Sequence, residues 1–262
     1  MMPAAKPDDD TLATRRSLLM GLSAVGATVA VGTLASGCAA LEPGIPGESV
    51  DERPVVKPGT ERVYRTLNGY NREQRSLATH RFSAEGSRLE GIDYDEAGSG
   101  GFGRPIARLI ARQFNAEGHL TVLERADGSH TTFDPPLQVL PFPLVPRRHV
   151  RQDVFARDVF ARDTGNPKPR RVIMITRVGR WETVTVPAGM FRALRVSRDL
   201  FMGDFEFHRT ETQRREIDWY APSAGAVVRA SEDSEHQDLM IGRSPGGRAS
   251  SRRGDWLIRE LT

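Results

Sequence analysis

From Val172 to Val196 the chain reads VIMITRVGRWETVTVPAGMFRALRV, in which apolar and polar residues alternate over three short segments. Alternation with a period of two is typical of a strand with one buried face. It predicts strands over residues 172–178, 181–186 and 191–196. Gly179-Arg180 fits a two-residue hairpin turn, and Pro187-Ala188-Gly189 fits a second tight turn. Three consecutive strands joined in this way predict an antiparallel meander.

The same alternation recurs on both sides of this stretch, between segments rich in turn-forming residues. The further strands that it predicts are residues 63–70, 74–82, 120–123, 131–133, 205–208, 215–220, 226–230 and 256–261. The last strand is expected to pair with a distant or N-terminal partner. Residues 106–114 carry apolar side chains near a 3.6-residue period, which predicts a helix. The predicted fold class is mainly β: an antiparallel meander sheet, open or half-barrel, with one short helix.

A tandem repeat, VFARD, occupies residues 154–158 and 159–163. Side chains alternate between the two faces of a strand, so an offset of five residues sends the second copy to the opposite face. We therefore expect one copy to leave the sheet, with a phenylalanine more exposed than usual.

The N-terminal residues have the order of a signal peptide: a basic start, an apolar middle and small residues before a cleavage point. Arg15 and Arg16, in TRRSLL, resemble a twin-arginine export signal, and Ala35-Ser36-Gly37 before Cys38 resembles a bacterial lipobox, although leucine is commonest at the position of Ala35. The resemblance implies cleavage between Gly37 and Cys38 and a diacylglyceryl thioether on Cys38. A plain signal peptide and an uncleaved transmembrane helix are the alternatives.

A lipid on Cys38 would hold the protein stably in the cell envelope, on the periplasmic side. Ala39 follows the cysteine where an inner-membrane lipoprotein would have Asp, and by resemblance this implies the outer membrane. We expect three parts: a signal peptide over residues 1–37, a lipidated Cys38 with a Pro- and Gly-rich tether over residues 38–58, and a β-rich domain over residues 59–262.

The composition is that of a soluble globular domain, with 38% hydrophobic and 27% charged residues and a net charge of +3. Cys38 is the only cysteine, so the mature domain has no thiol left for a disulfide, an iron–sulfur cluster or a cysteine nucleophile. Arginine supplies the positive excess among interspersed acids, which indicates a solvated surface. Nucleic acid is not an expected partner in this compartment.

Two turns carry a resemblance to a family. The segments VTVPAGMFRAL at residues 184–194 and WYAPSAGAV at residues 219–227 resemble those of uncharacterised bacterial exported lipoproteins with a β-rich domain. These proteins have V-P-A-G-T-F and W-Y-A-P-G-x-G-x-V turns, and Met190 and Ser223 replace the Thr and Gly here. Phe142-Pro143-Leu144 is similar to their F-P-L segment, although Arg147 and Val150 stand where Gly and Trp are usual. The resemblance implies a fold and no particular chemistry.

A glycine-rich loop is the first candidate for a cofactor site. Gly98, Gly100 and Gly103 match G-x-G-x-x-G, and Glu124 follows about 20 residues later, where an acid that binds the ribose of FAD or NAD would stand. The residues before the loop are acidic, however, and not the buried apolar strand that such a fold needs. A flexible loop is the simpler interpretation, and no cofactor is expected.

A candidate metal set is Asp204, Glu206 and His208, which share one face of a predicted strand. Phe205 and Phe207 occupy the other face, so an amphipathic strand with a solvated side explains the same pattern. The sequence has no HExxH, G-x-S-x-G or Walker A motif. We therefore expect no metal site, no catalytic residue and no enzyme activity.

The sequence thus predicts a lipid-anchored envelope protein that acts as a binding or structural interaction module, with an envelope protein or an apolar ligand as its partner. The first alternative is a carrier of an acyl chain or another apolar ligand, and the second is an exported enzyme that binds FAD or NAD. An apolar cavity of several hundred Å³ would favour the carrier, and a solid core the interaction module.

Overall fold

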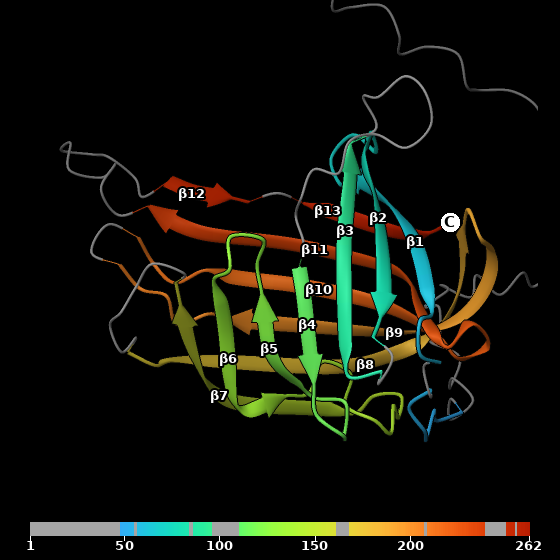
Figure 1. Cartoon of the computed structure of the whole chain (residues 1–262), viewed down its shortest axis with the longest axis horizontal. Coiled ribbons are helices and arrows are strands. Elements are labelled where there is room, and N and C mark those ends of the chain that lie inside the picture. The colour runs from blue at the N-terminus through green and yellow to red at the C-terminus, as the bar shows by residue number, and fades with distance from the viewer. Residues whose placement is uncertain are drawn as a thin grey trace, which may run out of the picture. The chain divides into compact units, whose positions relative to one another are not determined.

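A computed structural model describes residues 48–54, 57–83, 86–95, 110–160, 168–206, 209–238, 250–254 and 256–262 (Figure 1). All of them belong to one compact unit, Gly44–Thr262. Within these residues thirteen strands form a single antiparallel sheet. The strands are β1 Glu61–Asn68, β2 Gln74–Phe82, β3 Arg88–Asp95, β4 Ile110–Phe114, β5 Leu120–Glu124, β6 His130–Leu137, β7 His149–Val159, β8 Arg170–Val186, β9 Gly189–Phe201, β10 Gln213–Ala221, β11 Ala226–Asp238, β12 Ser250–Arg253 and β13 Leu257–Leu261.

The sheet closes on itself, which corrects the prediction of an open sheet or half-barrel. Strand β13 pairs with β1 on one side and β11 on the other, and β10 pairs with both β9 and β11. Twelve strands therefore form a barrel, with β12 attached to β11 alone. Closure gives backbone partners to strands that would otherwise be edges. In Figure 1, β2 to β6 run across β8 to β11, so the barrel consists of two crossed layers.

The prediction of a helix over residues 106–114 is wrong for residues 110–114. Residues 110–114 form strand β4, which pairs with β3 and β5, and residues 106–109 lie outside the described residues. Five residues carry a weak periodic signal, and the backbone hydrogen bonds offered by two flanking strands decide their conformation. The one helical element in the described residues is a single 3₁₀ turn, Pro222–Ala224. No described helix is long and apolar enough to cross a membrane.

Residues 172–196 belong to one long hairpin of two strands, β8 and β9, rather than to three strands. Strand β8 runs without a break through Gly179-Arg180, where a bulge shifts the register against β9. Gly179 is needed there for space, because a Cβ atom would lie 3.0 Å from the carbonyl oxygen of Arg195. The second predicted turn is confirmed: Gly189, with a φ of 133°, connects β8 to β9. A β-bulge and a hairpin turn both have a glycine between two apolar segments, so the sequence pattern at Gly179 fits either of them.

Three clusters of buried apolar side chains stabilise the barrel. The first is Leu120, Leu137, Val154, Ala156, Val172, Met174 and Leu200, the second is Leu144, Val178, Leu194, Val196 and Tyr220, and the third is Val184, Val186, Ala193, Ala221 and Val228. Burial of each large aliphatic side chain contributes about 1.5–3 kcal/mol. The third cluster covers the tip of the β8–β9 hairpin.

Residues 48–54, which we call the strap, were predicted to be part of a free tether but lie against the barrel. The backbone of Val50 exchanges two hydrogen bonds with Leu144, at 3.0 and 2.8 Å, and the indole nitrogen of Trp181 donates to the carbonyl of Glu48 at 3.0 Å. Contacts with the barrel therefore begin before residue 59.

The tandem repeat lies at the end of β7, and its two copies differ as the parity argument requires. Val154 points inward and is 1% exposed, whereas Phe155 points outward and is 54% exposed. The strand ends at Val159, and Phe160 is 56% exposed. The strand thus ends within the second copy, between Val159 and Phe160, and residues 161–163 lie outside the described residues.

Candidate ligand cavity in the barrel lumen

The barrel encloses a cavity of about 280 Å³. One side, which we call the apolar wall, is formed by inward side chains of β4 to β9. Among its members are Phe114, Leu120, Phe133, Leu137, Val172, Met174, Leu200 and Met202. Four partly buried side chains pack against the first apolar cluster and keep part of their surface exposed to the lumen: Phe114, Phe133, Val139 and Met202.

The opposite side, the charged wall, consists of Arg198 on β9, Arg214, Glu216 and Asp218 on β10, Glu232 on β11 and Arg259 on β13. Arg198 lies between two carboxylates and donates to Glu216 at 3.0 Å and to Asp218 at 2.7 Å. Its third contact is a hydrogen bond of 3.0 Å to the carbonyl of Val139. Only 4% of the Arg198 side chain is exposed, so this is a buried charge network.

The network decides the protonation of its acids. Burial alone would raise the pKa of Glu216, but Arg198, Arg214 and Arg112 lower that pKa to about 2. The same acids, in turn, raise the pKa of Arg198 against the opposing effect of burial. Arg214 lies 3.4 Å from Glu216 and 3.5 Å from Glu232. Glu216 is therefore ionised at neutral pH.

Arg112, on β4, projects into the same cavity from the facing side. Its neighbours in register on β3 and β5 are Leu89 and Leu123, which also line the cavity. Arg112 makes no hydrogen bond or ion pair with any residue in the described part of the chain. Burial, followed by the charge of Arg259, lowers the pKa of Arg112. Burial and the neighbouring positive charge therefore destabilise the charged form of Arg112 more than the acids across the cavity stabilise it.

His80 and Tyr64 lie beside this arginine. Their rings are 4.8 Å apart, and the Tyr64 hydroxyl donates to the carbonyl of Val227 at 3.0 Å. Burial, and then the charges of Arg112, Arg259 and Arg62, lower the pKa of His80 to about 3. His80 is therefore neutral at physiological pH and adds no charge to the cavity.

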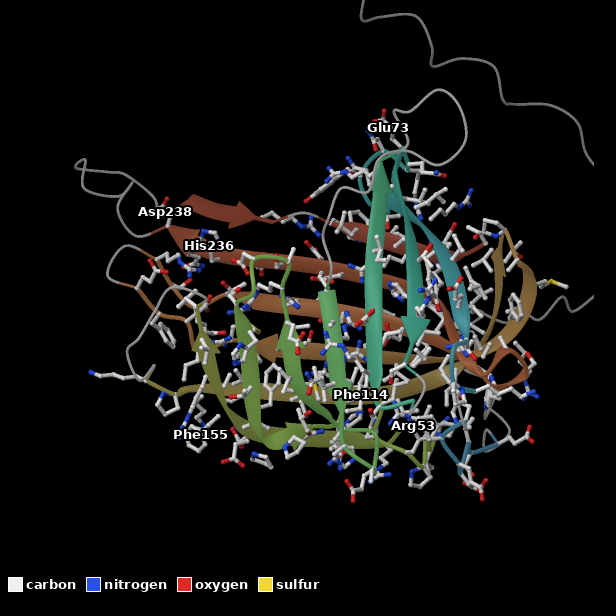
Figure 2. The ribbon with its side chains drawn as sticks, in the orientation of Figure 1. Arg53, Glu73, Phe114, Phe155, His236 and Asp238 are labelled. Atoms are coloured by element: carbon white, nitrogen blue, oxygen red, sulfur yellow. The ribbon has the colours of Figure 1, made fainter. Side chains whose placement is uncertain are left out.

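The strap borders one end of the cavity. Arg53 and Pro54 line it, and the guanidinium of Arg53 lies 5.2 Å from the centre of the Phe114 ring. Figure 2 shows these two residues together at the same end of the barrel. Gly118 leaves the room that Arg53 occupies, because a Cβ atom there would collide with the guanidinium.

Of the predicted cofactor residues, Glu124 is the one that the structure describes. It ends β5 in an antiparallel sheet, and both of its oxygens accept hydrogen bonds from Arg88, at 2.9 and 2.7 Å. These bonds lower the pKa of Glu124. Its carboxylate is already paired, and the described strands around it, β4 and β6, are antiparallel neighbours rather than the parallel strands of a dinucleotide site. Gly98, Gly100 and Gly103 lie outside the described residues.

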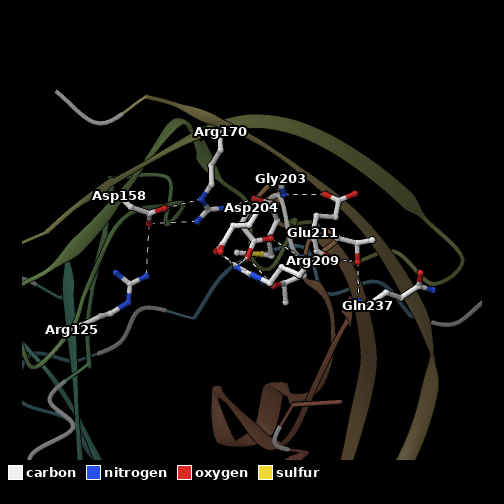
Figure 3. Close-up of polar contacts among 12 residues, drawn as sticks. Arg125, Asp158, Arg170, Gly203, Asp204, Arg209, Glu211 and Gln237 are labelled. Atoms are coloured by element: carbon white, nitrogen blue, oxygen red, sulfur yellow. Dashed lines mark hydrogen bonds and ion pairs between the residues drawn. The ribbon is translucent and has the colours of Figure 1, made fainter. Parts of the chain in front are cut away.

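The predicted metal set does not come together in the described residues. Asp204 and Glu206 lie in a loop after β9, not on a strand, and Arg209 contacts both of them, at 3.2 and 2.8 Å (Figure 3). Asp204 also accepts hydrogen bonds from the backbone and hydroxyl of Thr212. The predicted strand over residues 205–208 is therefore wrong at its start, and His208 lies outside the described residues. Within the described part, no three acids or histidines are grouped as metal ligands would be.

The predicted export and lipidation residues, Arg15, Arg16, Gly37 and Cys38, also lie outside the described residues. Sequence reasoning did not identify the cavity residues Arg112, Arg198, Glu216 and Asp218. One signal was present: Arg214, Glu216, Asp218 and Tyr220 alternate on one face of β10. Without knowledge that the sheet closes, such a face is interpreted as solvated.

Comparisons with known proteins do not assign this chain to a family. No protein-family model matches its sequence, and no curated protein matches it either. It is similar to a solved structure described as a lipoprotein from Parabacteroides distasonis, with a TM-score of 0.39 and 14% identity over 82% of this chain and 99% of that chain. It is also similar to an exported protein with a YmcC-like fold from Bacteroides fragilis, with a TM-score of 0.36 and 14% identity over 78% of this chain and 96% of that one. Similarity of this extent does not bear on ligand or activity.

Proposed function

We propose that this chain is a lipid-anchored binding protein of the bacterial cell envelope, whose barrel lumen holds a small apolar or amphipathic ligand. The observation that supports the proposal is the cavity of about 280 Å³ with its apolar wall. Protein interiors are packed as densely as organic crystals, so a void of this size is not an ordinary packing defect. It favours the carrier over a purely structural module.

The size of the cavity limits the ligand. Ligand sites typically measure about 300–1,000 Å³, so this lumen, at about 280 Å³, lies just below that range. One acyl chain or a compact ring system suits it better than a lipid with two chains. Arg53 and Pro54 of the strap border the cavity, and Arg53 lies against Phe114 of the apolar wall, which would help to retain such a ligand. Attachment through Cys38 and placement at the outer membrane belong to the same proposal and rest on the sequence pattern of residues 14–39.

The experiment begins with the intact mass of the wild-type protein and of Cys38→Ser from membrane and soluble fractions. We expect a diacylglyceryl mass on the wild type alone. The unlipidated Cys38→Ser chain is then titrated with N-phenyl-1-naphthylamine, a neutral apolar fluorophore, and we expect saturable one-to-one binding. Ala230→Trp fills the lumen and should weaken binding at least about tenfold, because Ala230 lines the cavity.

Met190→Trp is the matched control, since Met190 is 73% exposed and lies outside the cavity. It adds the same indole without filling the lumen and should leave binding unchanged. Absence of saturable binding to the parent chain would refute the ligand-binding role whether or not Ala230→Trp folds. Release of the wild type from membranes without an acyl mass would refute the anchor.

A further inference from the structure

Arginines outnumber carboxylates in the lining of the cavity, and Arg112 is the arginine on β4 that no described residue pairs with. Within the described residues, three carboxylates line the lumen: Glu216, Asp218 and Glu232. Each has an arginine of its own wall within 3.7 Å. The Coulomb interactions of these acids with Arg112 are therefore shared with partners that are already in contact. Arg112, on the facing side, feels the charges of these acids, but none of them forms a hydrogen bond or an ion pair with it within the described residues.

The surroundings of Arg112 make this charge costly. Its register neighbours are leucines, and His80, whose pKa is lowered in part by the charge of Arg112, is neutral. Arg62, the next arginine, donates to the carbonyl of Gly225 at 2.9 Å and has no acid partner in the described residues either. An unpaired charge in a cavity of low dielectric constant is unfavourable unless an opposite charge is supplied. A guanidinium is also the side chain that best matches a carboxylate or a phosphate, because its fork can donate two parallel hydrogen bonds.

The apolar wall begins next to the guanidinium. Phe114 lies two residues further along β4 on the same face, and Leu120 and Leu137 continue the apolar surface on β5 and β6. A ligand with its charge at Arg112 would thus have its chain directly on this surface. We propose that the lumen binds a single-chain anionic amphiphile, with a carboxylate or phosphate head at Arg112 and its chain along the apolar wall. This inference rests on the proposed binding function and adds the class of ligand.

The test compares ligands that share one chain and differ at the head, using the full chain with Cys38→Ser. Dodecanoate, dodecyl phosphate and dodecanol compete with N-phenyl-1-naphthylamine for the lumen. We expect the better of the two anions to bind at least about tenfold more tightly than the alcohol. The ratio between dodecanoate and dodecyl phosphate then identifies whether the natural head is a carboxylate or a phosphate.

Arg112→Met removes the charge and keeps most of the volume of the side chain. It should abolish the preference for the anion and leave the affinity for dodecanol and for the neutral fluorophore unchanged. Arg157→Met, on the exposed face of β7, is the matched control and should retain the preference. Arg112→Met should also unfold at an equal or higher denaturant concentration, because it removes an unpaired buried charge.

Three results would overturn the inference: equal affinity for the anions and the alcohol, an unchanged preference in Arg112→Met, or a lower unfolding midpoint of that variant, which would assign the guanidinium a structural role. If the neutral fluorophore binds and the anions show no preference, the inference fails while the binding function stands. If no probe binds at all, both fail.

Discussion

On β8 the lumen is lined by Val172 and Met174 after Arg170 at the start of the strand, whereas on β10 Glu216 and Asp218 lie between Arg214 and Tyr220. Both strands alternate with a period of two, and both have one face toward the same cavity. The apolar wall gains stability from burial, and the charged wall keeps its place because Arg198 satisfies two acids at once. Alternation therefore identifies a strand, but it does not say which face of that strand points inward.

The largest expected loss of stability comes from a substitution in the charged wall. Arg198→Met leaves Glu216 and Asp218 buried without their main partner, which should lower the free energy of unfolding at pH 7 by about 3–5 kcal/mol. Urea unfolding followed by circular dichroism measures the loss. The triple variant Arg198→Met, Glu216→Leu, Asp218→Leu removes the charges together and should recover most of the stability. A loss below about 1 kcal/mol in the single variant would mean that the network is solvated rather than buried.

A truncation in the apolar wall should cost less. Met174 is fully buried, and Met174→Ala should lower the free energy of unfolding by about 3 kcal/mol through lost burial and an enlarged cavity. Met174→Leu keeps the volume and should cost less than about 1.5 kcal/mol. The same urea experiment measures both variants. Equal losses in the two would show that this wall depends on the shape of methionine and not on filled volume.

The smallest effect concerns pH and tests the residue between the two walls. The pKa of His80 falls from 6.5 in the unfolded chain to about 3 in the folded protein. Between these values the unfolded chain binds a proton that the folded protein does not, so stability rises with pH across this window and is lost as the pH falls. From pH 7.5 to pH 5 the free energy of unfolding should decrease by about 2 kcal/mol.

His80→Asn removes this titration and should flatten the pH dependence between pH 7.5 and pH 5. Urea midpoints at several pH values, measured side by side for the two proteins, provide the comparison. Parallel curves would mean that His80 titrates normally and that the arginines around it are not close enough to depress its pKa.

Local patterns in the sequence were sufficient for most of the strands. The predicted strand over residues 74–82 coincides with β2, and the predicted turn over residues 187–189 has Gly189 at a φ of 133°. The expectation that residues 256–261 pair with an N-terminal partner is confirmed by β13 and β1. These features depend on residues near one another in the sequence, or on the simple rule that apolar segments near a terminus are tied down.

The remaining features depend on contacts that local patterns do not encode. β10 has Trp219 on the face away from Asp218, where the indole nitrogen donates to Glu182 at 2.8 Å and the ring packs against the cluster at the hairpin tip. The outward face of β10 is therefore covered at Trp219 but exposed at Gln213 and Arg215, and the other face lines the cavity. Sequence alternation could not show that the face with the charged residues Arg214, Glu216 and Asp218 is the one that points inward. The cavity was foreseen only as an alternative, because its walls come from strands far apart in the chain.

The place of β13 in the barrel has a consequence for how the protein folds. Every strand from β1 to β11 pairs with its neighbours in chain order, whereas β13 joins β1 across a separation of 195 residues at Arg65 and Glu260. Closing so long a loop is entropically expensive and is typical of slow steps in folding. The chain can therefore assemble eleven strands as an ordered sheet before five residues complete the ring. Because the ring is complete only when β13 pairs with β1 and β11, a ligand held in the lumen would stabilise the closed barrel over a sheet that lacks these pairings.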